Sequence, residues 1–138
     1  MPGSLPASSL ATVRRAVDTE GAPEPIGPYS QAVEAGGVLY CSGQIPLDPG
    51  SGELVEGGIA EQARRCLESL DAVCRAGGAS LDGAARITIY LTDLSLFDEL
   101  NEVYSEFFSE PFPVRTTVGV SELPRGALVE MDATVPIS

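Results

Sequence analysis

The 138-residue chain contains no histidine, no lysine and no tryptophan. Without histidine, Ser–His–Asp triads and Cys–His pairs cannot form, and the commonest metal ligand is missing. Without lysine, the chain cannot form a Schiff base with a carbonyl substrate. A carboxylate is therefore one of the few side chains left that could act as a general base near neutral pH.

Basic charge is scarce and is carried by arginine alone. The chain has 20 acidic and 8 basic residues, so its formal net charge is −12. Arg14 and Arg15 are the only basic residues before Arg64, and no basic cluster is visible. Phosphate backbones and anionic membranes bind clustered Lys and Arg, so neither nucleic acid nor membrane is expected as a partner. We attribute the acidity to solubility.

Cysteine and long apolar runs are also scarce. The three cysteines are Cys41, Cys66 and Cys74. On one helix over residues 59–76, the last two would lie about 12 Å apart along the axis, beyond the roughly 7 Å limit between the Cα atoms of a disulfide. We therefore expect reduced thiols packed in the core of a cytoplasmic protein and no zinc site. No apolar run approaches the roughly 18 residues that span a membrane.

The length suits one domain with a hydrophobic core. Residues 1–11 are expected to be a disordered lead-in, and residues 12–138 to be the domain. Hydrophobic periodicity predicts strands at 12–17, 30–35, 38–43, 84–91, 115–120 and 128–135, and helices at 59–76 and 94–108. This order predicts an α+β fold with one mixed sheet and both helices on one face. The other face is too apolar to stay in water, so we expect neighbouring subunits to cover it.

The segment FPVRTTVGV (112–120) carries Arg115 inside a β-branched run, where a buried guanidinium needs an anion. Because residues 121–126 resemble a turn, we expect the last two strands to form a hairpin, with Arg115 opposite Asp132 and Glu130 on the diagonal. The valines would then face the helices, and the three charged residues would share the other face. The anion is either Asp132, in a cross-strand ion pair, or a ligand carboxylate, and Glu130 would then be a general base or a water-orienting group.

Four more polar or small residues are candidates for a site. Tyr29 follows a Gly-Pro bend, where it could line a pocket or simply pack. Ser42 ends a strand without a basic partner, so a hydrogen-bonding role suits it better than nucleophilic attack. Gly43 allows close approach of the backbone to a ligand. Asn101 lies in a helix beside the apolar stripe, so it either faces solvent or has a specific partner.

Five segments occur in order along the chain: IGPYSQ (26–31), CSGQIP with its following loop (41–53), the helix from EQA onward, YLTDLSLFDELNEVYSEFF (90–108) and FPVRTTVGVSELPRGALVEMDA (112–133). Together they resemble the Rid family, the YjgF-type reactive-intermediate deaminases, of which RidA is the best-known branch. The resemblance covers roughly residues 12–138. It implies a chorismate-mutase-like α+β fold and a homotrimer with one site in each cleft between subunits.

The resemblance also implies a cofactor-free hydrolase like 2-iminobutanoate/2-iminopropanoate deaminase, which converts 2-imino acids and enamines such as 2-aminoacrylate to 2-keto acids and ammonia. The family arginine that grips the substrate carboxylate maps onto Arg115, and the carboxylate that positions water maps onto Glu130. The remaining cleft positions map onto Tyr29, Ser42, Gly43 and Asn101, and onto Thr117, where many members have cysteine. The alternatives are a trimeric protein that binds keto acids or amino acids without catalysis, and a tailoring enzyme of a biosynthetic pathway.

Overall fold

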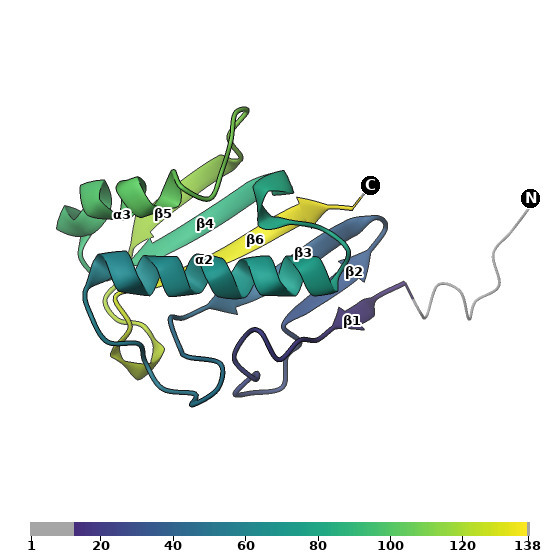
Figure 1. Cartoon of the computed structure of the whole chain (residues 1–138), viewed down its shortest axis with the longest axis horizontal. Coiled ribbons are helices and arrows are strands. Elements are labelled where there is room, and N and C mark those ends of the chain that lie inside the picture. Colours follow the sequence, from purple (N-terminus) through teal and green to yellow (C-terminus); the bar gives the residue numbers. More distant parts are fainter. Residues whose placement is uncertain (1–12, 138) are drawn as a thin grey trace, which may run out of the picture.

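Six strands form one mixed sheet, and two helices cover one of its faces (Figure 1). The computed structural model describes residues 13–137, so the expected lead-in over residues 1–11 lies outside the described residues. The strands are β1 (Arg15–Val17), β2 (Ala32–Ala35), β3 (Val38–Gln44), β4 (Arg86–Leu91), β5 (Val114–Gly119) and β6 (Val129–Pro136); the helices are α2 (Ile59–Ala76) and α3 (Phe97–Tyr104). Short 3₁₀ helices are η1 (Leu81–Gly83), η2 (Leu94–Leu96) and η3 (Pro124–Gly126). The expected α+β class and element order are confirmed.

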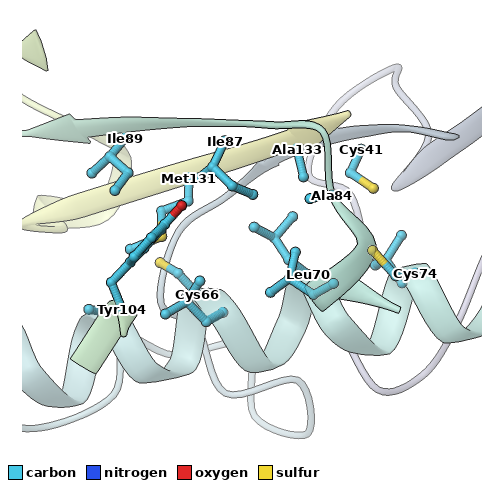
Figure 2. Packing of buried hydrophobic residues seen from close by; sticks show 14 of the residues in the cluster. Cys41, Cys66, Leu70, Cys74, Ala84, Ile87, Ile89, Tyr104, Met131 and Ala133 are labelled. Atoms are coloured by element: carbon cyan, nitrogen blue, oxygen red, sulfur yellow. The ribbon is translucent and has the colours of Figure 1, made fainter. Parts of the chain in front are cut away.

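The apolar face of α2 forms the centre of the core. Its buried residues recur at steps of three and four and include Ile59, Ala63, Cys66, Leu67, Leu70, Val73 and Cys74. The three cysteine thiols are free and buried, and Figure 2 shows them among the apolar side chains between α2 and the sheet. Burial raises the pKa of the Cys66 thiol, which donates a hydrogen bond to the Gln44 carbonyl at 3.1 Å. Cys66 and Cys74 are small core residues, as expected from the sequence, and Cys41 is buried with them. No helix within residues 13–137 is long and apolar enough to span a membrane.

Removing one side chain from this core should destabilise the protein strongly. Leu70→Ala empties a site that is fully buried, and such truncations cost about 2–5 kcal/mol. Leu94→Ala is the matched control, since Leu94 is 55% exposed and its truncation should cost less than about 0.5 kcal/mol. Urea unfolding at one fixed protein concentration measures both. Equal losses in the two variants would contradict the position of Leu70 in the core.

The order of the strands differs from the expected hairpin. The sheet runs β1-β2-β3-β6-β4-β5, so β4 lies between the last two strands of the chain. β4 pairs with β6 in the antiparallel sense and with β5 in the parallel sense. Arg115 therefore pairs with Ile87, and Asp132 pairs with Thr88. The predicted hairpin, with Arg115 opposite Asp132, is wrong.

The burial of each strand explains this order. Every second residue of β6, from Val129 to Val135, is at most 3% exposed, and a strand with so apolar a face gains most at the centre of a sheet. β5 has an exposed or half-buried side chain at every position, as expected for an edge strand. The segment between β5 and β6 contains η3 in place of a tight turn, so the chain has room to pass the end of β4.

The face of β5 toward the helices was also predicted incorrectly. Ile87 and Ile89 are fully buried beneath the helices, and their register partners are Arg115 and Thr117. Residues in register on neighbouring strands project to the same side, so Arg115 faces the helices. Val114 and Val118 project to the open face of the sheet, where they are 58% and 38% exposed. The position of β5 at the edge of the sheet explains why Arg115 can face the helices. At the edge, a long side chain can extend toward the helix side and keep its charged group out of the apolar core.

Candidate active site

A cavity of about 400 Å³ lies between β3, β6 and the loop that precedes β2. Four of the predicted site residues line it together: Tyr29, Ser42, Gly43 and Glu130. Most of the other lining residues are apolar, among them Pro23, Ile26, Ile45, Leu47 and Pro124, and none is basic. The cavity thus joins hydroxyl groups and two carboxylates, those of Glu24 and Glu130, to an apolar wall.

Glu130 is the ionisable group best placed for chemistry in this cavity. It lies on β6 between Val129 and Met131, whose side chains are fully buried on the helix side, so its own side chain projects to the opposite face. Burial, and secondly the negative charge of Asp132, raise the pKa of Glu130 above the 4.5 of an ordinary glutamate. Asp132 itself accepts a hydrogen bond from the Tyr90 hydroxyl at 3.0 Å. A carboxylate with a raised pKa is a better general base near neutral pH.

The position of the Glu130 side chain requires a glycine at residue 43. A Cβ atom on Gly43 would overlap Oε2 of Glu130 and would lie closer than ordinary van der Waals contact to its Cδ and Cγ atoms. The sequence suggested that Gly43 lets the backbone approach a ligand, and in the structure it lets the Glu130 side chain lie across β3. The close neighbour is the mobile end of a side chain, so a larger residue would displace the carboxylate before it disturbed the fold.

Gly43→Ala should therefore reduce activity more than stability. We expect kcat to fall about tenfold or more, because Glu130 is moved out of position, and the free energy of unfolding to change by less than about 1 kcal/mol. Gly83→Ala is the matched control, since a Cβ there meets nothing within 4 Å. Steady-state kinetics and urea unfolding of both variants test this. If Gly43→Ala retains full kcat, the close packing does not matter for catalysis.

Local hydrogen bonds hold the wall of the cavity in place. The Ser42 hydroxyl donates to the Ser30 carbonyl at 2.6 Å, and the Tyr29 hydroxyl accepts from the Ile26 backbone N–H at 3.2 Å. Gln31 is only 2% exposed, and its amide binds the backbone of Thr19 and of residues 22–23. Sequence reasoning missed Gln31, although it closes the IGPYSQ segment. Ser42 is tied to the backbone as a donor, which agrees with a hydrogen-bonding role.

Arg115 lies at a second location, on the helix side of the sheet edge. Its guanidinium carbon is 5.3 Å from the centre of the Phe97 ring and 4.7 Å from that of Tyr104, both on α3. The ion pairs formed within residues 13–137 involve Arg15, Arg64, Arg65 and Arg75, but not Arg115. Asp132 projects to the opposite face from Arg115. The cross-strand Arg–Asp ion pair is thus absent from the described part of the chain.

Asn101 and Thr117 accompany Arg115. Asn101 is half-buried on α3, and its Oδ1 atom is buried without a hydrogen-bond partner among residues 13–137. Thr117 lies two residues beyond Arg115 on the same side of β5 and is also half-buried. The seven predicted residues therefore form two groups. The first group, Tyr29, Ser42, Gly43 and Glu130, lines the cavity; the second group, Asn101, Arg115 and Thr117, lies at the β5 edge on the other face of the sheet.

Neither group has the composition of a metal centre. Across residues 13–137, no group of three or more Cys, Asp or Glu side chains is arranged to hold a metal ion. The second group contains Arg115, a cation that forms no ion pair within residues 13–137. The first group contains Glu130, a carboxylate whose pKa is raised. Such a pair can bind an anionic substrate and activate water.

The chain is similar to known proteins over most of its length. A model of the family described as Endoribonuclease L-PSP matches residues 19–137. A RutC family protein of Pyrococcus abyssi is 48% identical over 120 residues, which cover 87% of this chain and 94% of that protein. Human 2-iminobutanoate/2-iminopropanoate deaminase is 40% identical over 121 residues, 88% of each protein. The crystal structure of RidA from the Antarctic bacterium Psychrobacter sp. is 43% identical with a TM-score of 0.86, over 90% of this chain and 100% of that one. The chain belongs to the Rid (YjgF) family, the one that this family model describes.

Proposed function

We propose that the protein hydrolyses 2-imino acids and their enamine tautomers to 2-keto acids and ammonia without a cofactor. The observation that carries the proposal is Arg115, a half-buried arginine that has no acidic partner within residues 13–137. A guanidinium in this state suits a planar carboxylate, which it can bind through two parallel hydrogen bonds. The human relative is named as a deaminase of two 2-imino acids, and such substrates carry this carboxylate.

The proposal requires a second copy of the chain. Arg115 and Glu130 lie on opposite faces of the sheet, so a single chain cannot bring both to one small molecule. The open face exposes large apolar and aromatic side chains, including Tyr40 at 49% and Val114 at 58%, and surfaces of this kind are commonly covered by another subunit. The proposed assembly is a homotrimer in which Arg115 of one subunit faces the Glu130 cavity of its neighbour.

The chemistry follows from these two groups. Arg115 holds the substrate carboxylate and fixes the position of the imine carbon, which supplies orientation. Ionised Glu130 accepts a proton from water as the water oxygen forms a bond to that carbon. Protonated Glu130 then gives that proton to the nitrogen. The hydroxyl proton of the adduct moves to the nitrogen as the carbon–nitrogen bond breaks, and the products are a carbonyl group and ammonia. One imine and one water are consumed, so the reaction needs no oxidant or reductant.

The direct test generates imino acids in place with an amino-acid oxidase and traps them with semicarbazide. If the proposal is correct, adding the protein lowers the yield of semicarbazone and raises that of free 2-keto acid. Oxygen consumption by the oxidase serves as the control, because it must stay unchanged. No effect on small or large imino acids would overturn the deaminase proposal, and binding of pyruvate without turnover would then favour a binding protein.

A further inference from the structure

Helix α3 presents two aromatic rings to the one arginine of β5. Phe97 and Tyr104 are seven residues apart, so they lie on the same face of the helix, two turns from each other. Both ring centres lie within about 6 Å of the Arg115 guanidinium carbon, the range of a cation–π contact. The remaining arginines in residues 13–137 are in contact with no aromatic ring in this way.

The arrangement leaves the donor edges of the guanidinium unused. A guanidinium is poorly hydrated on its two flat faces and carries its five N–H donors around the edge. Aromatic rings therefore take the place of water on a face without occupying the donors. Arg115 forms no ion pair within the described residues, so no carboxylate in that part of the chain competes with an anionic ligand for those donors.

We infer that Phe97 and Tyr104 are positioning residues that hold the Arg115 side chain in the orientation in which it binds a carboxylate. The inference rests on the proposed function and extends it to two residues outside the predicted site. A free arginine side chain samples many rotamers, and an arginine already held in place loses less freedom when the ligand binds. The rings do this without touching the reacting atoms.

The aromatic ring of Tyr104, and not its hydroxyl, holds the Arg115 side chain in position. The hydroxyl is buried and has no hydrogen-bond partner within residues 13–137, while the ring contacts Arg115 and packs on Phe108 at 4.5 Å between ring centres. Tyr104→Phe keeps the ring and is the conservative variant, whereas Tyr104→Leu removes it. Phe97 is 36% exposed, so Phe97→Leu changes the contact without emptying the core.

The first test observes Arg115 directly and does not depend on activity. The chain has eight arginines, so its Nε–Hε groups give a simple nitrogen–proton NMR spectrum, in which Arg115→Lys identifies the signal of Arg115. Ring currents should displace this signal from those of the other arginines, and Phe97→Leu should move it toward them. Phe112→Leu, at another exposed phenylalanine, should leave it in place. An Arg115 signal that does not respond to Phe97→Leu would overturn the inference.

The second test measures the effect on binding. Phe97→Leu should raise KM for the imino acid, and the Kd of pyruvate, about tenfold with little change in kcat, because the carboxylate grip acts on substrate binding. Tyr104→Leu should do the same, and Tyr104→Phe should restore most of the affinity. In an Arg115→Ala background, where no cation meets the rings, Phe97→Leu should have no further effect.

The outcomes separate the inference from the proposed function. A tenfold loss that persists in the Arg115→Ala background, or a loss in kcat alone, would assign Phe97 a structural role and overturn the inference. If the unmodified protein neither hydrolyses imines nor binds pyruvate, the proposed function fails, and the NMR signal of Arg115 still decides whether the rings hold it.

Discussion

Arg115→Ala should lower kcat/KM for imino-acid hydrolysis by about 100-fold or more. The variant removes two charge-assisted hydrogen bonds to the substrate carboxylate, and losing such a pair costs about 3 kcal/mol, which is a factor of roughly 100 in rate. Most of the loss should be in KM, because the carboxylate is bound both before and during the reaction. The semicarbazide competition assay, run over a series of substrate concentrations, measures it.

The matched control is Arg75→Ala. Arg75 lies on α2 and forms an exposed ion pair with Asp71 at 2.8 Å, and pairs of this kind contribute little. Arg75→Ala should leave KM and kcat unchanged, which excludes an effect of net charge alone. Arg115→Lys should fall between the native protein and Arg115→Ala, since lysine keeps the charge but not the two parallel donors. Wild-type kinetics in Arg115→Ala would contradict the proposal that Arg115 binds the substrate carboxylate.

Glu130→Gln should reduce kcat by about 10²–10⁴-fold, the usual contribution of a general base. The substitution keeps the size of the side chain and removes its ability to accept a proton. In the native protein, activity requires ionised Glu130, so it should fall as the pH drops through the pKa of Glu130. Since burial and Asp132 raise this pKa above 4.5, the acid limb of the pH profile should lie above that of an ordinary glutamate. The limb should be missing in Glu130→Gln.

Asp132→Asn tests the second cause of the raised pKa of Glu130, the negative charge of Asp132; burial is the first. Removing the negative charge of Asp132 makes ionisation of Glu130 easier, so the pKa of Glu130 falls and the acid limb of kcat should move to lower pH. The Tyr90 hydroxyl, which donates to Asp132, can still donate to the asparagine oxygen. A limb that moves to higher pH, or that stays in place, would show that Asp132 does not act on Glu130 through its charge.

Much of the local structure was predicted from the sequence. The periodicity of residues 59–76 gave the buried face and the length of α2, because an amphipathic helix depends on residues three and four positions apart. The second helix was predicted to end at residue 108, whereas α3 ends at Tyr104. Alternation along β6 separated Glu130 and Asp132 from the buried valines. These properties depend on near neighbours in the chain, so one sequence is enough to show them.

The pairing of the strands could not be predicted from local patterns in the sequence. Alternation divides β5 into two faces, but only the parallel register with β4 decides that Arg115, and not Val114 or Val118, faces the helices. The sequence of the loop between β5 and β6 is compatible with a hairpin that pairs these two strands, and equally with a connection that places β4 between them. The choice depends on the total burial of β6 at the centre of the sheet, a free energy summed over many residues far apart in the sequence.

The sequence by itself determined the α+β class, the residue types of the site and its lack of histidine and lysine chemistry. It also predicted seven site residues, which the structure arranges in two groups. Only the tertiary structure decided that these groups lie on opposite faces of the sheet, that Gly43 makes room for Glu130, and that Phe97 and Tyr104 contact Arg115. Each of these features depends on how separate strands and helices are placed against one another, which no local pattern specifies.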